Sequence, residues 1–270
     1  MHTIAEDGNQ VYALDYRADG VLFATGGKDY KVRVYEEATN SLVHTLESGW
    51  VGEPSAGHSN RVFALKFHPD HANLILSGGW DNTIQVWNLD TGKPQSSMYG
   101  AHLCGEALDV AGDEVLTGSW RPDKQLQVWD LCSGELRSEV PFGVSKSADK
   151  VCHLYAAQFS KAGASGSRLI AAGGSGANEL RLFEYGQPVA LAQMKLPRGV
   201  YGLDLSHDNA RVAVAGGDCT VRVVHVPQAL APVPVPVPAP VPVPAAPPAL
   251  PVSSTPGAPA LEDVDAVDAD

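Results

Sequence analysis

The hydrophobic pattern of the first 226 residues is a series of short apolar runs separated by polar, glycine-containing turns. In the stretch LILSGGWDNTIQVW, residues 74–87, two runs rich in β-branched and aromatic residues flank the turn sequence GGWDN. This chemistry predicts a β-hairpin. Because a single hairpin is only marginally stable in water, the stretch must belong to a larger β-structure.

The hairpin pattern recurs along the chain. Related stretches lie at 21–35, 114–129, 168–183 and 211–224. A further strand-like segment precedes each hairpin (VYALDY, VFALKF, EALDV, LYAAQF and VYGLDL), and most units continue into a fourth apolar segment. Four strands per unit, repeating about every 40 to 55 residues, predict the blades of a β-propeller. Stacking such sheets around an axis buries both of their apolar faces.

The five predicted blades divide an all-β domain of residues 1–226. Their approximate bounds are 11–50, 58–100, 102–142, 151–197 and 199–226. The fifth unit meets Pro227 before a fourth strand, so we expect residues 1–8 to pair with it as a closing strand that protects the sheet edge. Three arrangements stay open: a closed five-bladed ring, an open arc or shortened seven-bladed form, and a ring completed by a partner.

The polar residues of the repeat resemble those of the WD40 family. In that family a Gly-His pair precedes the first strand, Ser or Thr ends the second, Asp lies in the next turn and Trp closes the third. The second unit matches at Gly57, His58, Ser77, Asp81 and Trp87. The third unit offers His102, Thr117, Asp123 and Trp129, with Arg121 and Pro122 inserted before Asp123. The first keeps Thr25 and Asp29, whereas the fourth and fifth keep mainly the strands.

The resemblance implies a WD40-like β-propeller of about five four-stranded blades, in which these polar residues are structural. Linked as Trp87–Ser77–His58–Asp81, they would satisfy one another inside the blade, where an unpaired polar group costs about 1–3 kcal/mol. A hydrolase triad of His58, Ser77 and Asp81 uses the same residue types. We expect the structural role, because the repeat context and Trp87 predict burial away from any substrate.

Three tryptophans fall in loops at one rim of the predicted ring. Trp80 and Trp120-Arg121 lie between second and third strands, and Trp50 lies in a loop that enters a first strand. Arg61, His153 and Arg198 stand just ahead of first strands at the same rim. Trp and Arg dominate binding hot spots, so these residues predict a protein-binding face for a peptide or an extended segment. The alternative is that each Trp folds over its own loop.

Other candidate chemistry is sparse, and we expect no cofactor and no metal. GGSGAN, residues 173–178, lacks the third glycine of a dinucleotide fingerprint and falls in a hairpin turn. His68 and His71 have a spacing that metal ligands use, but they lie in a loop without a second pair. Cys152-His153 suggests a thiol nucleophile, yet no orienting partner can be named.

Charge and cysteine content narrow the class of protein. The net charge is -12, and the acidic surface gives no footprint for nucleic acid. The cysteines show no paired framework, and we expect them to be reduced; they are Cys104, Cys132, Cys152 and Cys219. Neither a signal peptide nor a membrane-spanning run is recognisable, so we expect a cytoplasmic protein, with a nuclear or ciliary location left open.

The composition changes abruptly at Pro227. The segment APVPVPVPAPVPVPAAPPALP favours polyproline II, and the acidic end LEDVDAVDAD favours disorder. We expect residues 227–270 to be a disordered tail that serves as a spacer. The alternative is that PAAP or PALP binds a proline-binding module, although neither has a flanking Arg or Lys.

The sequence therefore predicts a non-catalytic interaction scaffold or adaptor in a multiprotein assembly, which binds other proteins on a propeller rim. One alternative is a propeller enzyme with a central-pocket active site, for which no acid, base or metal constellation can be assembled. A second is a structural subunit of a ciliary or cytoskeletal complex. Fold alone does not decide between them.

Overall fold

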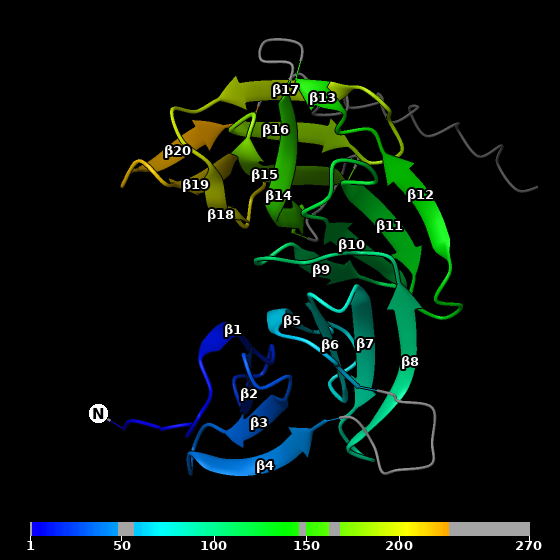
Figure 1. Ribbon diagram of the computed structural model, residues 1–270, viewed down its shortest axis with the longest axis vertical. Coiled ribbons are helices and arrows are strands. Elements are labelled where there is room, and N and C mark those ends of the chain that lie inside the picture. Colours follow the sequence, from blue (N-terminus) through cyan, green and yellow to red (C-terminus); the bar gives the residue numbers. More distant parts are fainter. Residues whose placement is uncertain (1, 48–56, 146–149, 162–167, 227–270) are drawn as a thin grey trace, which may run out of the picture. The chain divides into compact units, whose positions relative to one another are not determined.

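The computed structural model describes residues 2–47, 57–145, 150–161 and 168–226. Within these ranges every regular element is a β-strand, and the strands form five antiparallel sheets (Figure 1). The prediction of an all-β structure with five propeller-like sheets is confirmed. No helix with the length and hydropathy of a membrane span occurs in the described residues.

Each sheet is built from one contiguous segment, with its strands paired in chain order. The first sheet contains β1 (Val11–Tyr16), β2 (Leu22–Gly27), β3 (Val32–Glu36) and β4 (Ser41–Leu46). The second contains β5 (Val62–Phe67), β6 (Leu74–Gly79), β7 (Thr83–Asn88) and β8 (Lys93–Tyr99). The third contains β9 (Leu108–Ala111), β10 (Glu114–Gly118), β11 (Leu126–Asp130) and β12 (Leu136–Val140).

The fourth sheet adds the two-residue β13 (Val144–Ser145) to β14 (Lys150–Phe159), β15 (Leu169–Gly176), β16 (Glu179–Glu184) and β17 (Ala190–Lys195). The fifth sheet has three strands, β18 (Val200–Leu205), β19 (Arg211–Gly216) and β20 (Val221–His225). Residues 2–8 form no strand, and β20 pairs only with β19 among the described residues. The structure therefore does not show the closing strand expected from residues 1–8.

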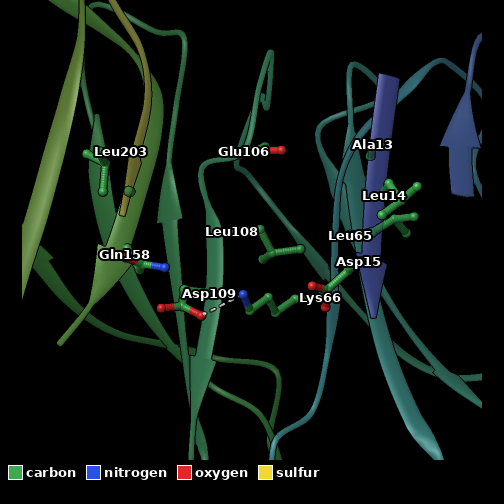
Figure 2. A pocket seen from close by; sticks show the side chains of 11 residues that line it. Ala13, Leu14, Asp15, Leu65, Lys66, Glu106, Leu108, Asp109, Gln158 and Leu203 are labelled. Carbon is green, nitrogen blue, oxygen red and sulfur yellow. Dashed lines mark ion pairs between the residues drawn. The ribbon is translucent and has the colours of Figure 1, made fainter. Parts of the chain in front are cut away.

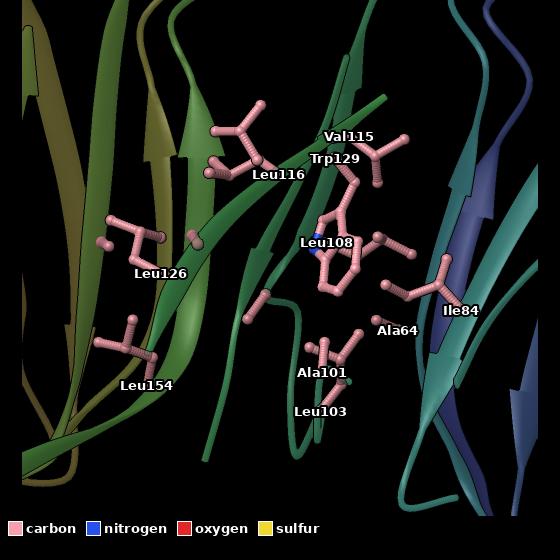
Figure 3. Close-up of a cluster of buried hydrophobic side chains, with 14 of the residues drawn as sticks. Ala64, Ile84, Ala101, Leu103, Leu108, Val115, Leu116, Leu126, Trp129 and Leu154 are labelled. Atoms are coloured by element: carbon pink, nitrogen blue, oxygen red, sulfur yellow. The ribbon is translucent and has the colours of Figure 1, made fainter. Parts of the chain in front are cut away.

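The first strand of each sheet packs against the first strand of the sheet before it, and β5, β14 and β18 pack against the second strand of that sheet as well. The close approach explains the glycines in the second strands: a Cβ added to Gly26 would lie 2.7 Å from Val62 Cγ1, and one added to Gly173 would lie 2.8 Å from Val200 Cγ1. Figure 3 shows the apolar core between the second, third and fourth sheets, with Trp129 at its centre. Burial of these faces is the main favourable term in folding.

The turn between the second and third strands has a recurring backbone conformation. One non-glycine residue in each of these turns has positive φ, between 52° and 70°. These residues are Tyr30, Asn82, Lys124, Asn178 and Cys219. Asn adopts this conformation readily, whereas Tyr, Lys and Cys do so at some cost. The repeat is thus conserved in backbone geometry even where its side chains differ.

The first strands of all five sheets line one pocket, and they are β1, β5, β9, β14 and β18. Figure 2 shows Leu14 of β1 and Leu203 of β18 among the residues that line it. The arc of sheets in residues 2–226 therefore curves far enough to bring its two ends to one cavity.

Candidate interaction surface

The second sheet contains the complete polar chain predicted from the sequence. Trp87 Nε1–H donates to Ser77 Oγ at 2.7 Å. Ser77 Oγ also lies 2.7 Å from His58 Nε2, and His58 Nδ1 lies 2.7 Å from Asp81 Oδ2. Because Ser77 Oγ accepts from Trp87, its own proton points to Nε2, which leaves Nδ1–H to donate to Asp81. The chain thus satisfies each polar group in turn.

Asp81 anchors this chain to the turn. Its carboxylate accepts the backbone N–H groups of Ser59 at 3.0 Å and Thr83 at 3.1 Å. Burial alone would raise the pKa of Asp81, but its hydrogen bonds with His58 and the backbone outweigh burial and lower the pKa. Ser77 and Trp87 are fully buried. A substrate cannot reach the Ser77 hydroxyl in this arrangement, so the triad geometry does not make a hydrolase site.

The third sheet keeps only half of the predicted set. Trp129 Nε1–H donates to Thr117 Oγ1 at 2.9 Å, as Trp87 does to Ser77. His102 instead pairs with Asn82 Oδ1 at 2.8 Å, in the turn of the second sheet, and Asp123 is exposed. The inserted Arg121 and Pro122 lengthen this turn, which accounts for the displacement of Asp123. The structure does not bring His102 and Asp123 to Thr117.

In the first sheet a residue that sequence reasoning missed takes the central place. Glu6 accepts hydrogen bonds from the hydroxyls of Thr25 and Tyr35, the latter at 2.9 Å, and from Arg33 Nη1 at 3.0 Å. Arg33 Nη2 in turn donates to Asp29 at 2.5 Å. Burial and the bond to Glu6 raise the pKa of Tyr35 to about 12. The Glu6 carboxylate thus takes the place of the histidine of the Gly-His pair. The only feature of the sequence that could have indicated this role is its position shortly before β1.

The central pocket carries charges that serve the sheet junctions. Lys66 Nζ lies 3.7 Å from Asp109 Oδ1 (Figure 2). Asp15 accepts the backbone N–H of Phe67 at 2.6 Å, and Asp109 accepts that of Phe159 at 2.8 Å. Burial raises the pKa values of both carboxyl groups. Because these groups bind the backbone of the next sheet, they hold neighbouring sheets together.

A series of aromatic rings follows the rim on which the sequence placed Trp80 and Trp120. Tyr12 stacks on Phe63 with ring centroids 4.8 Å apart, Phe63 contacts Trp80 at 5.0 Å, and Trp80 stacks on His102 at 6.1 Å. The guanidinium of Arg61 lies over the Trp80 ring at 5.1 Å. Trp80 Nε1–H points to Cys104 Sγ, and burial raises the pKa of that thiol to about 11.

The series continues over the fourth and fifth sheets. Trp120 stacks on His153 with centroids 4.7 Å apart, and its Nε1–H donates to the Tyr155 hydroxyl at 3.0 Å. Tyr155 meets Tyr201 edge to face at 5.0 Å. Trp120 is 41% exposed and Tyr201 is 51% exposed. The structure thus brings Trp120 and His153 together, and Trp80 with Arg61.

Bulges in the first strands position four of these rings. In four sheets the pairing of the first strand with the second shifts register at one place, and one residue of the first strand there has no partner in the second. These strands are β1, β5, β14 and β18, and the residues are Tyr12, Phe63, Tyr155 and Tyr201. A bulge re-aims the side chain that it carries. Sequence reasoning missed these residues, although an aromatic second residue in VYALDY, VFALKF and VYGLDL was a visible signal.

The remaining rim candidates differ in their surroundings. Arg121 Nη2 donates to Asn82 Oδ1 at 3.1 Å, which ties the third sheet's turn to the second. Arg198 is exposed just ahead of β18. Trp50 lies outside the described residues. The rim therefore presents aromatic rings with cationic side chains beside them.

The other sequence candidates are structural. His68 is buried, accepts the N–H groups of Asp70 and His71 at Nδ1, and pairs with Gly112 O through Nε2. No group of three or more potential metal ligands occurs in the described residues. Burial raises the pKa of Cys152, which points to Glu179 O. The GGSGAN segment spans the β15–β16 hairpin.

Comparison with known proteins bears on the same repeats. The family model "WD domain, G-beta repeat" matches residues 1–36, 42–88 and 193–225. These segments include most of the first sheet, most of the second and the whole fifth. The resemblance to the WD40 family is thereby confirmed: the chain carries WD40 repeats. The third sheet, which keeps Thr117 and Trp129, lies outside the matched segments.

Three relatives illustrate the range of similarity. The small ribosomal subunit protein RACK1 of Drosophila melanogaster is 35% identical over 80 residues, 29% of this chain and 25% of that protein. Coronin-7 of Bos taurus is 28% identical over 124 residues, 44% of this chain and 12% of its own length. Cell division cycle 20.1, cofactor of APC complex, from Arabidopsis thaliana is 23% identical over 268 residues, 83% of this chain and 56% of that protein. The chain thus matches at most 56% of these relatives' lengths.

Proposed function

We propose that the protein is a non-catalytic interaction scaffold that binds an extended segment of another protein along the aromatic rim. The observation that carries this proposal is the series of ring contacts that runs from Tyr12 to His102 and from Trp120 to Tyr201. Aromatic side chains with a polar tip contribute large contact areas and hydrogen bonds at interfaces.

The exposure of the rim separates binding residues from supporting ones. Trp120 and Tyr201 are exposed, whereas Phe63 and Trp80 are half-buried beneath Arg61 and beside His102. We therefore assign direct contact with the partner to Trp120 and Tyr201. Trp80 supports the surface by packing against Phe63, Arg61 and His102.

The relatives support a protein-interaction role in general terms. By its name the Arabidopsis relative is a cofactor of the APC complex, and the Drosophila relative is a protein of the small ribosomal subunit. Both names describe members of multiprotein assemblies. We propose that this chain is likewise part of an assembly, and that the rim is one of its contacts there.

A library of random linear peptides displayed on phage tests the rim directly. Peptides are selected on the full chain and then measured against the variant Trp120→Ala/Tyr201→Ala. We expect at least about a tenfold loss of affinity, because truncating a hot-spot aromatic typically costs 2 kcal/mol or more. Tyr99→Ala, a change at an exposed tyrosine of β8, is the matched control and should leave binding unchanged. Equal binding to the double variant and the wild type would remove the rim as the site.

The segment 227–270 lies outside the described residues, so its predicted disorder, its spacer role and the proline-binding alternative stay predictions. A chain without residues 227–270 should bind the rim peptides with unchanged affinity if the segment is a spacer. A purified proline-binding domain titrated with both forms separates the alternative, since only the full chain would bind it.

A further inference from the structure

The fifth sheet exposes positions that are core positions in every other sheet. The second and third strands of each sheet form a hairpin. Two residues of the third strand lie on the face that meets the next sheet, and each is paired with a small or apolar residue of the second strand. In the first four sheets these residues are 0–3% exposed; they are Val32, Val34, Ile84, Val86, Leu126, Val128, Leu180 and Leu182. Val221 and Val223 hold the same places in the fifth sheet and are 73% and 62% exposed.

The first sheet, at the other end of the row of five sheets, exposes the complementary face. Val62, Leu65 and Phe67 of β5 pack against the first sheet and are at most 7% exposed. Val11, Leu14 and Tyr16 hold the same positions in β1 and are about half exposed, at 48%, 53% and 49%. The two end sheets therefore expose the two sides of one repeated junction. Exposed apolar area of this kind marks an interaction site.

A polar feature of the junction is also incomplete at the fifth sheet. In three of the first strands, the side chain at the same position accepts a backbone N–H from the first strand of the next sheet, at 2.6–2.8 Å. These side chains are Asp15, Asp109 and Gln158. Asp204 holds this position in β18, and its side chain is 67% exposed. It pairs with Lys161 of the preceding sheet at 3.0 Å and accepts no backbone N–H from a following sheet in the described residues.

We propose that the face of β18–β20 receives a β-sheet supplied by a second protein, which also covers β1. The incoming first strand would place apolar side chains over Val221 and Val223 and give a backbone N–H to Asp204. This continues the junction that already joins the sheets of the chain, and so it needs no new type of contact.

Ala215 defines the chemistry of the incoming strand. It lies opposite Val221, where the other sheets have glycine: Gly26, Gly78, Gly118 and Gly173. At Gly26 an added Cβ would meet the large side chain of Val62 at 2.7 Å. The partner therefore carries a small residue, Gly, Ala or Ser, at the place where β5 carries Val62.

The same residue disfavours a second copy of this chain as the occupant. A second copy would bring Val11 to the Ala215 Cβ, as Val62 is brought to Gly26. In addition, Leu14 of β1 and Leu203 of β18 line one pocket, so a single partner can reach both end sheets. A sheet from a different protein, with a small residue at that place, avoids the contact with Ala215.

Site-specific photo-crosslinking tests the proposal on the full chain. The photoreactive residue p-benzoylphenylalanine replaces Val223 in one protein and the exposed Tyr99 in a control protein, and both are irradiated in an extract of the source cells. Crosslinked peptides are mapped by mass spectrometry. We expect a crosslink from position 223 to a β-strand of another protein, absent from the Tyr99 control. Crosslinks to β1 of the same chain or of a second copy, or none above the control, would overturn the proposal.

The crosslinked protein is then purified and added to the full chain. We expect amide hydrogen exchange in β1 and β18–β20 to slow by about tenfold or more, because a covered junction opens less often. Val223→Glu should remove this protection, whereas Trp120→Ala/Tyr201→Ala should retain it, which separates this surface from the aromatic rim. Unchanged exchange in the wild type, or protection that persists with Val223→Glu, would contradict the proposed face.

Discussion

The second and fifth sheets of this protein share one hairpin pattern but have opposite surroundings. TIQVW in β7 and TVRVV around β20 both alternate apolar and polar residues, and both follow a turn with a residue at positive φ. Ile84 and Val86 are buried against the third sheet, whereas Val221 and Val223 face outward. The comparison shows that sequence pattern determines the hairpin, while the neighbouring sheet determines whether its apolar face is covered.

The turn aspartates of the second and fifth sheets also have different surroundings. In the second sheet Asp81 binds His58 and the backbone, within a chain that ends at a buried Trp87. In the fifth sheet Asp218 pairs with Arg222 close to the solvent, and these bonds lower the pKa of Asp218. A buried polar chain stabilises only when every member is satisfied, whereas an exposed pair contributes little.

The largest expected difference comes from placing a charge at equivalent positions. Val86→Glu should destabilise the protein by about 4 kcal/mol or more, because it buries an unpaired carboxylate. Val223→Glu should change the free energy of unfolding by less than about 0.5 kcal/mol in the isolated chain, since the side chain is solvated. Urea denaturation measures both. Comparable losses for the two variants would show that Val223 is covered within the chain.

A smaller effect is expected from the turn aspartates of the second and third sheets. Asp81→Ala should cost about 2–3 kcal/mol, because it leaves His58 and two backbone N–H groups without their acceptor. Asp123→Ala, its matched control in the third sheet, should stay within about 0.5 kcal/mol, since Asp123 is exposed. Thermal unfolding of the two variants checks this. Equal losses would indicate that Asp123 does join a polar chain in solution.

Glu6 should have a more modest influence than Asp81, because it accepts hydrogen bonds from side chains, whereas Asp81 also accepts two backbone N–H groups. Glu6→Ala is expected to cost about 1–2 kcal/mol through the loss of its bonds to Thr25, Tyr35 and Arg33. Asp7→Ala removes a neighbouring exposed carboxylate and should be nearly neutral. Chemical denaturation compares the pair. If both variants matched the wild type, the segment before β1 would not stabilise the sheet.

The smallest expected effect is a pH dependence from His68. Burial lowers the pKa of this imidazole below its usual 6.5, so the folded protein binds its proton less readily than the unfolded chain. Its contribution is therefore complete above pH 6.5 and is lost as the pH falls below that value. The free energy of unfolding should decrease more between pH 7 and pH 5 in the wild type than in His68→Asn. Parallel pH profiles would exclude His68 as the cause.

The architecture could be predicted because its signals are local. Alternating apolar residues and turn chemistry indicate hairpins, and the spacing of the hairpins indicates stacked sheets. The polar chain of the second sheet was equally accessible, because His58, Ser77, Asp81 and Trp87 stand at their family positions. In each case residues close in sequence or repeat supplied the information.

The features that could not be predicted from the sequence depend on contacts that the hydrophobic pattern does not specify. Glu6 substitutes for a histidine only because the segment before β1 folds back on Thr25 and Tyr35. His102 turns to Asn82 of another sheet because the third turn is longer. The bulges that aim Tyr155 and Tyr201 toward the rim are a property of strand register, which the hydrophobic pattern does not encode.

The contiguity of each sheet also bears on how the chain is made. Every sheet in residues 2–226 consists of neighbouring strands in chain order, so its hydrogen bonds can form as soon as that segment leaves the ribosome. Each new sheet then finds a finished surface on the one before it. Synthesis can proceed without waiting for a distant partner strand, and at its growing end the nascent chain exposes one unfinished apolar face at a time.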